Sequence, residues 1–281
     1  MKIVTSKKEL SEELSQIRKV GKSIGFVPTM GALHDGHLSL IEYSNKDNDI
    51  SIVSIFVNPT QFNDKNDYIK YPRIVEEDVD KLKKVKCDIL FTPSEKEMYP
   101  DEDKREFDFG NLDKVMEGAH RPGHFRGVAL IVSKLFETVK PDKAYFGEKD
   151  FQQLAIIKKL TSQLKFNIEI VSCPIVREKD GLAMSSRNML LSKEQRANVS
   201  IISKTLFAAK EKQKSMTVSE TKDWVIRTIN ENSFLKVEYF EIVDMTSLEP
   251  ITGWNQKAEK VGCVAVHVGT IRLIDNIRFY S

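Results

Sequence analysis

The stretch FVPTMGALHDGH, residues 26–37, joins an apolar run to two glycines and two histidines. IGFV (24–27) predicts a strand, and HLSLIEYSNK (37–46) predicts a helix because its apolar residues fall on adjoining faces. A strand that turns directly into a helix is the repeating unit of α/β folds. The rest of the chain repeats this order, so the stretch decides the fold class.

Strands and helices alternate through the first two thirds of the chain. DISIVSIFV (49–57) is continuous and β-branched, as expected of a strand buried on both faces. Further strands are predicted at 87–93, 144–147 and 168–176, and further helices at 6–19 (with Ser6 as a cap for Glu9), 74–85, 128–139 and 151–164. The alternation predicts a Rossmann-like, doubly wound parallel sheet, in which ligands bind beyond the carboxyl ends of the strands.

The pattern changes after about residue 175. Two helices are predicted at 193–214 and 218–232, and three mostly antiparallel strands at 237–245, 260–269 and 271–280. We therefore predict two domains. Residues 1–174 form a Rossmann-like domain, and residues 175–281 form a smaller C-terminal α+β lid.

Composition excludes several classes of function. The 281 residues carry 43 basic and 41 acidic side chains, so no broad surface for nucleic acid or membrane is expected. No apolar run approaches the ~18 residues of a membrane helix, and the N-terminus lacks a signal-peptide core. Cys87, Cys173 and Cys263 lie far apart in apolar runs, which predicts buried thiols in a reducing cytoplasm.

The first motif with chemistry is the glycine-histidine turn itself. Gly31 and Gly36 permit tight turns, and the helix that follows offers N–H groups and a dipole suited to phosphate. His34 and His37 can point at one spot and donate to a phosphorus centre as it gains charge. A capped turn with incidental histidines explains this stretch equally well. A metal site is less favoured, because no third ligand lies nearby.

Of four further motifs, three lie at predicted strand ends or the domain joint, and HRPGHFRGV lies in a glycine-bearing loop before a helix. SIFVNPTQF (54–62) offers the amides of Asn58 and Gln61, and YFGEKDFQQL (145–154) offers Lys149 and Gln153. The remaining two are HRPGHFRGV (120–128), with two arginines and two histidines, and VREKDGLAMSSRN (176–188). Each alone is also consistent with an ordinary turn, a solvated charged loop or a linker. Together they predict nucleotide phosphate chemistry on a small polar co-substrate.

These stretches together resemble the pantoate–β-alanine ligase family, the pantothenate synthetases. The resemblance runs in order from PTMGALHDGH through FVNPTQF, YPR (71–73), RPGHFRGV, PDKAYFGEKDFQQL and VREKDGLAMSSRN to TIRLIDNI, and covers most of the chain. HDGH (34–37) and MSSR (184–187) also resemble the two signatures of the nucleotidyltransferase and class I aminoacyl-tRNA synthetase superfamily.

The resemblance implies a two-step reaction, with nucleotide and pantoate bound in the first domain. Pantoate and ATP give pantoyl adenylate and pyrophosphate, and β-alanine then displaces AMP to give pantothenate. His34, His37 and Lys149 would be catalytic, with His37 as proton donor. Gln61 and Gln153 would bind pantoate, with Gln61 also near β-alanine. The implied ATP-binding residues are Met30, Gly31, Ala32, Leu33, His34, Asp35, Gly36, His37, Gly147, Glu148, Lys149, Asp150, Val176, Met184, Ser185, Ser186 and Arg187.

The resemblance also implies Mg²⁺ as a cofactor with ATP, a homodimer, a cytoplasmic location, and neither nucleic acid nor membrane as partner. We expect Mg²⁺ to bind through phosphate oxygens and water, with no dedicated metal site and Asp78 as a candidate carboxylate. Tyr71 and Arg121 are further candidates for phosphate contacts. Two other interpretations stay open: a cytidylyl- or adenylyltransferase on the same fold, and a non-catalytic nucleotide-binding or nucleic-acid-binding protein.

Overall fold

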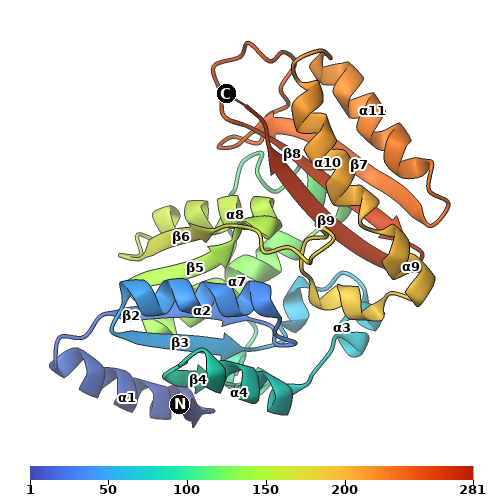
Figure 1. Cartoon of the computed structure of the whole chain (residues 1–281). Coiled ribbons are helices and arrows are strands. Elements are labelled where there is room, and N and C mark those ends of the chain that lie inside the picture. The colour runs from blue at the N-terminus through green and yellow to red at the C-terminus, as the bar shows by residue number, and fades with distance from the viewer. Residues whose placement is uncertain (281) are drawn as a thin grey trace.

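The computed structural model describes residues 1–280 and contains two β-sheets (Figure 1). The larger sheet has six parallel strands in the order β1-β4-β3-β2-β5-β6. The smaller sheet has three antiparallel strands in the order β7-β8-β9. The predicted doubly wound α/β sheet followed by a smaller α+β part is therefore confirmed.

The parallel sheet contains every strand that the sequence predicted before residue 175, and one more. Its strands are β1 (Lys2–Val4), β2 (Ile24–Thr29), β3 (Ile50–Ile55), β4 (Ile89–Phe91), β5 (Lys143–Gly147) and β6 (Glu169–Cys173). β3 is buried along nearly its whole length, as its continuous apolar pattern predicts. The sequence did not predict β1, because three residues are too few to show the repeat of apolar residues that is typical of a strand.

Helices cover both faces of this sheet. The helices of this part of the chain are α1 (Lys7–Lys19), α2 (Asp35–Asp47), α3 (Lys65–Lys70), α4 (Val75–Lys84), α5 (Glu95–Met98), α6 (Met116–His120), α7 (His124–Val139) and α8 (Phe151–Gln163), with short 3₁₀ turns η1 (Pro59–Gln61) and η2 (Glu148–Asp150). α1, α7 and α8 bury Leu14, Phe136 and Ile156 in the core on one face. α2 and α4 bury Ile41 and Leu82 on the other. The two cores fix the sheet between its helices.

Local chemistry sets the ends of α1 and β2. The Ser6 side chain accepts from the N–H of Glu9 and the Glu9 carboxylate accepts from the N–H of Ser6, which confirms Ser6 as the cap. β2 continues to Thr29, past the predicted end at residue 27. Pro28 is tolerated there because β5 pairs only with Gly25 and Phe26, so its missing N–H removes no bond on that side.

The second part of the chain builds the smaller sheet and its helices. Its elements are η3 (Ser186–Leu190), α9 (Lys193–Asn198), α10 (Ile201–Lys212), α11 (Val218–Asn230), β7 (Leu235–Asp244), β8 (Lys260–Val268) and β9 (Ile271–Arg278). The prediction of one helix over 193–214 is wrong. The helix divides at Val199 and Ser200, where the N–H of Ile202 bonds the Val199 carbonyl in a three-residue step.

The two sheets meet across a mixed apolar and charged junction. Met116 and Phe151 pack against Val261 and Cys263 of the smaller sheet. Beside them the buried Glu117 carboxylate of α6 accepts from Arg272 of β9 at 2.6 and 2.8 Å, and from the Tyr239 hydroxyl at 2.7 Å. We propose that the domain boundary lies near residue 174, because β6 ends at Cys173 and the smaller sheet has a separate core. No helix within residues 1–280 is long and apolar enough to cross a membrane.

The Glu117–Arg272 pair predicts how the junction responds to acid. Burial raises the pKa of Glu117, but hydrogen bonds from Arg272 outweigh it and hold the pKa at about 2, below the ordinary 4.5. A lowered carboxyl pKa contributes stability above about pH 4.5 that is lost as pH falls toward 2. The Glu117→Gln substitution should lower the free energy of unfolding at pH 7 by on the order of 3 kcal/mol.

Urea titrations at several pH values measure this effect. The variant should also lose less stability than the parent protein between pH 4.5 and pH 2. Glu241→Gln is the matched control, because Glu241 forms a partly exposed pair with Lys222 and such pairs contribute little. If the free energy of unfolding falls equally with pH in Glu117→Gln and in the parent protein, Glu117 does not cause the acid sensitivity of the junction.

Candidate active site

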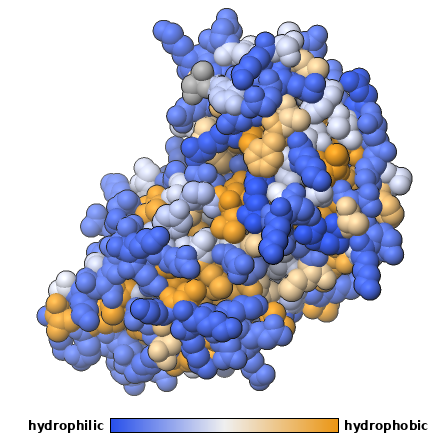
Figure 2. All heavy atoms as spheres, viewed as in Figure 1, coloured by the Kyte–Doolittle hydropathy of each residue, from blue (hydrophilic) through white to orange (hydrophobic). Residues whose placement is uncertain are grey.

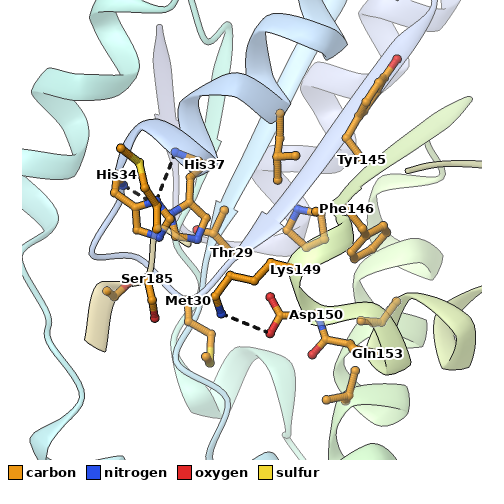
Figure 3. A pocket seen from close by; sticks show the side chains of 18 of the residues that line it. Thr29, Met30, His34, His37, Tyr145, Phe146, Lys149, Asp150, Gln153 and Ser185 are labelled. Carbon is orange, nitrogen blue, oxygen red and sulfur yellow. Dashed lines mark hydrogen bonds and ion pairs between the residues drawn. The ribbon is translucent and has the colours of Figure 1, made fainter. Parts of the chain in front are cut away.

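A cavity of about 220 Å³ lies at the carboxyl ends of the parallel strands, where the smaller part of the chain meets the sheet. Figure 2 shows apolar surface in this region between the two lobes, within a mostly hydrophilic exterior. Side chains that face the cavity come from both sides of the junction, and Figure 3 shows several of them. This is the position at which parallel α/β sheets bind ligands.

His34 and His37 form a neutral pair at one side of the cavity. Their ring centroids are 4.1 Å apart. The Nδ1 of His34 accepts from the N–H of Gly36 at 3.1 Å, and the Nδ1 of His37 accepts from the N–H of His34 at 3.3 Å. In a neutral ring with an accepting Nδ1, the proton sits on Nε2. The backbone therefore fixes both rings with an Nε2–H as their remaining donor.

Burial is the main reason that both rings are neutral. Burial and then the nearby Lys149 ammonium lower the pKa of His34 to about 4. Burial, followed by His34 and Lys149, lowers the pKa of His37 well below its usual 6.5. Each ring can thus donate a hydrogen bond at neutral pH without carrying a charge.

The histidines also cap α2, which changes the expected role of the helix end. His34 is the N-cap, and with His37 it reproduces the reciprocal bonding of a capping box. Within residues 31–38, the N–H groups of 31–34 and 36–38 all have partners in the chain. The turn therefore leaves few backbone N–H groups for a phosphate, which disfavours the predicted backbone site. Its remaining side-chain donors are the two Nε2–H groups.

Asp78 holds the glycine-histidine turn in place. Its fully buried carboxylate accepts from the N–H of Ala32 at 2.8 Å and of Leu33 at 2.7 Å. Lys81, one turn further along α4, donates to the Leu33 carbonyl at 2.8 Å. Both carboxylate oxygens are occupied by the turn and Asp78 does not face the cavity. The suggestion of Asp78 as a partner for Mg²⁺ is therefore wrong.

Lys149 and Gln153 approach from the end of β5. Lys149 lies in η2, and its side chain reaches toward the side of the cavity that holds the histidines (Figure 3). Its Nζ is 4.0 Å from the Asp150 carboxylate. Gln153 faces the cavity from the first turn of α8, whereas Gln152 is buried and bonds the carbonyls of Leu112 and Val115.

Gln61 is held in a fixed orientation by the second motif. Asn58 donates to the Gln61 Oε1 at 3.0 Å, and the Tyr99 hydroxyl donates to the Asn58 Oδ1 at 2.7 Å. This directs the Gln61 Nε2 away from Asn58, and it lies 3.3 Å from the Met30 sulfur. α7 approaches this turn so closely that a Cβ on Gly127 would lie 2.2 Å from the Thr60 carbonyl oxygen.

The third motif supports this turn, and of its residues Val128 lines the main cavity. The Nδ1–H of buried His124 donates to the Gln61 carbonyl at 2.8 Å, and its Nε2 accepts from Arg121 at 3.2 Å. Burial and then Arg121 lower the pKa of His124 to about 4. Arg121 lies in a smaller adjoining cavity, 3.7 Å from the Glu117 carboxylate. Lys149, Asp150 and Gln153 line both cavities, so the role of Arg121 in phosphate binding stays a prediction.

The fifth motif crosses the mouth of the cavity. The Ser186 hydroxyl donates to the Ala32 carbonyl at 3.0 Å, joining this loop to the glycine-histidine turn. Arg187 donates to the Asp67 carboxylate of α3 at 3.0 Å. The N–H of Met184 bonds the Val176 carbonyl at 3.0 Å, so the loop folds back on itself beside the cavity. No sequence pattern pointed to the roles that Asp67 and Tyr99 play here, because their partners are distant in the chain.

The structure brings most predicted site residues to the cavity. Those that line it are Met30, His34, Gly36, His37, Gln61, Tyr71, Gly147, Lys149, Asp150, Gln153, Val176, Met184, Ser185, Ser186 and Arg187. Those that do not are Gly31, Ala32, Leu33, Asp35 and Glu148. Ala32 and Leu33 are buried beneath the turn, and Asp35 is exposed to solvent. The turn thus presents only some of its residues to the cavity.

The parallel sheet, the histidine pair and the facing lysine define an α/β nucleotide-binding enzyme of the HxGH type. A family model described as pantoate–β-alanine ligase matches residues 2–278. The chain belongs to this family.

Individual relatives match over nearly the whole chain. The pantothenate synthetase of Bacteroides fragilis (strain YCH46) is 54% identical over 279 residues, 99% of each chain. A crystal structure of pantothenate synthetase from Thermus thermophilus has a TM-score of 0.93 at 40% identity, with both chains covered completely. The pantoate–β-alanine ligase of Francisella tularensis, described as complexed with β-γ ATP and β-alanine, has a TM-score of 0.83 at 36% identity, covering 99% and 97% of the chains.

The neutral histidine pair is directly testable. Because the pKa of His34 is about 4 and that of His37 lies well below 6.5, neither ring should gain a proton between pH 8 and pH 5.5. Ring ¹⁵N shifts in the free protein should show Nε2–H for both, and Nδ1–H for His124. Single His→Asn variants assign the signals. Protonation of either ring with a midpoint near pH 6.5 would contradict this structure of the site.

Proposed function

We propose that the protein joins pantoate to β-alanine with ATP, through a pantoyl adenylate, to give pantothenate, AMP and pyrophosphate. One observation carries the proposal: a single cavity holds two neutral N–H donors and a lysine at one side, and the oriented Gln61 amide and the Gln153 amide nearby. The donors suit phosphate, and the amides of Gln61 and Gln153 suit a hydroxylated acid. The membership of the pantoate–β-alanine ligase family supports the same activity.

The first step is attack on phosphorus. A carboxylate oxygen of pantoate bonds to the α-phosphorus of ATP, the bond to the bridging oxygen breaks, and pyrophosphate leaves. Such a transfer needs positioning and charge stabilisation more than covalent catalysis. We assign Lys149 to the α-phosphate and the Nε2–H groups of His34 and His37 to phosphate oxygens. Neutral donors that are already oriented strengthen as charge develops and need no reorganisation.

The second step is attack on the acyl carbon. The amine of β-alanine bonds to that carbon, the bond to the AMP oxygen breaks, and the nitrogen loses a proton. An acyl adenylate hydrolyses in water, so the cavity must exclude it. We assign Met184, Ser185, Ser186 and Arg187 to this closure, because their loop already contacts the turn at Ala32 and α3 at Asp67.

The proposal extends to the metal and the assembly. Asp150 is the carboxylate among the described residues that line the cavity, and it fits an ion that arrives on ATP and keeps several waters. Mg²⁺ held there with the phosphates would stabilise the pyrophosphate leaving group. We also propose a homodimer in the cytoplasm; the three cysteines are free and buried, which fits a reducing compartment.

Pyrophosphate release tests the function. With ATP, Mg²⁺ and pantoate alone, the protein should release one equivalent in a burst, because the adenylate stays bound. Addition of β-alanine should convert the burst to steady turnover with AMP and pantothenate as products. Absence of pantoate-dependent pyrophosphate would refute the substrate assignment, and would favour a nucleotidyltransferase for another acceptor.

The His37→Ala variant should lose most of its turnover, by roughly 100-fold or more, because a phosphate donor disappears. The fold should survive, since His34 remains as the cap of α2. Steady-state rates and thermal unfolding measure the two effects, with His267→Ala in β8 as the control distant from the cavity. A near-normal kcat for His37→Ala would remove this residue from the mechanism.

The Gln153→Ala variant should raise the KM for pantoate by about tenfold, because one hydrogen bond to a buried polar substrate is lost. The KM for ATP should change little. Gln163→Ala, at the exposed end of the same helix, is the matched control. Equal losses for pantoate and ATP would contradict the assignment of Gln153 to pantoate.

A further inference from the structure

The motif RLIDNI, residues 272–277, lies in β9, outside the main cavity. Nevertheless, Asp275 and Asn276 are only 3% and 4% exposed, although β9 is an edge strand of the smaller sheet. Buried polar groups need hydrogen-bond partners, and an edge strand can supply few from its own sheet. The partners of Asn276 lie across the junction in η2, and the side-chain partner of Asp275 is Arg177, next to the cavity-lining Val176.

Asn276 bonds the backbone that carries Lys149. Its Nδ2 donates to the carbonyl oxygen of Glu148 at 2.8 Å and to that of Lys149 at 3.1 Å. Both hydrogens of one amide group thus bind two successive carbonyls of η2. This is the turn in which the chain leaves β5 and enters α8, so these bonds set where the Lys149 side chain begins.

Asn276 is itself fixed by a buried ion pair. The Asp275 carboxylate accepts from the N–H of Asn276 at 2.7 Å and from both terminal nitrogens of Arg177 at 2.7 and 2.9 Å. Arg177 also donates to the carbonyls of Gly181 and Asn276, at 3.1 and 3.3 Å. Arg177 follows Val176, which lines the cavity. One buried cluster therefore links both cavity loops to β9.

From this geometry we propose that Asn276 is a positioning residue for Lys149, held in place by Asp275 and Arg177. The inference rests on the function proposed above. Lysine is a point charge on a flexible stem, so its effect on the α-phosphate depends on where its backbone is held. A displacement of about 1 Å can cost on the order of 100-fold in rate. The smaller sheet thus completes the phosphate site, in addition to covering it.

A double-mutant cycle distinguishes the positioning of Lys149 from a purely structural role, in which Asn276 only holds the smaller sheet against the parallel-sheet part of the chain. The variants are Asn276→Ala, Lys149→Ala and the double variant, compared with the parent protein. The measurement is the single-turnover rate of pyrophosphate release with saturating ATP, Mg²⁺ and pantoate and no β-alanine. Asn276→Ala should slow this step by about 10- to 100-fold. In the Lys149→Ala background, the Asn276→Ala substitution should slow pyrophosphate release by less than about twofold, because there is no ammonium left to position.

If the fold-loss in rate of the double variant equals the product of the two single-variant losses, the proposal is overturned, since Asn276 would then act independently of Lys149. An Asn276→Ala rate equal to that of the parent protein would also overturn it. Asn276→Asp keeps the size but replaces the donor with an oxygen facing two carbonyls, so it should be at least as slow as Asn276→Ala. Arg278→Ala is the matched control, because Arg278 contacts the Glu148 side chain from the same strand at the surface. It should retain the parent rate.

The affinity of the same four proteins for ATP tests the inference without pantoate. Calorimetric titration with MgATP should show weaker binding for Asn276→Ala and no further loss in the Lys149→Ala background. If pantoate proves to be the wrong acid, the rates fail for the parent protein while this cycle still decides the role of Asn276. If Asn276→Ala does not fold, Asn276→Ser, which retains one donor, should give an intermediate affinity. Unchanged affinity in a folded variant would refute the proposal.

Discussion

The Asp78 carboxylate is the contact on which the active-site geometry depends. Gly31 and Ala32 both have positive φ angles, of 82° and 51°, and a non-glycine residue in that conformation costs on the order of 1–3 kcal/mol. Asp78 offsets this cost by bonding the N–H groups of Ala32 and Leu33 inside the protein. The turn that results places His34 as the cap of α2 and brings His37 against it. Together with Lys81 and Ser186, which bond the Leu33 and Ala32 carbonyls, this carboxylate fixes the turn that carries the two rings.

Hydrogen bonds to the backbone of the glycine-histidine turn explain which donors the proposed phosphate site has. In many α/β proteins the N–H groups at a helix start bind the anion. Here Asp78, Thr29 and the two histidines take almost all of those groups, and the Nε2–H groups and Lys149 remain for a ligand. At each position the histidine Nδ1 accepts from the backbone, and the Nε2–H is left for the proposed contact with phosphate. Burial keeps the rings neutral, which makes both functions compatible.

The junction between the two sheets has a comparable double function. Glu117 with Arg272, and Asp275 with Arg177, are buried pairs that cross it or lie against it. Isolated buried ion pairs are weak contributors to stability, but they specify geometry when every oxygen has a partner. Both acidic groups meet that condition, and the same strand, β9, contributes to each pair. The smaller part of the chain is therefore docked in a defined register against α6 and η2.

The sequence by itself determined the fold class and most of the residues at the cavity. Strand and helix periods depend on neighbours in the chain, and strand ends in a parallel sheet converge, so His34, His37, Gln61, Lys149 and Gln153 were predictable as a group. Only the tertiary structure decided what each does. It assigned Asp78 to the turn, His124 to the Gln61 backbone and Asn276 to the backbone of Lys149. These contacts join residues 46, 63 and 127 positions apart, and no local pattern encodes a partner at such separations.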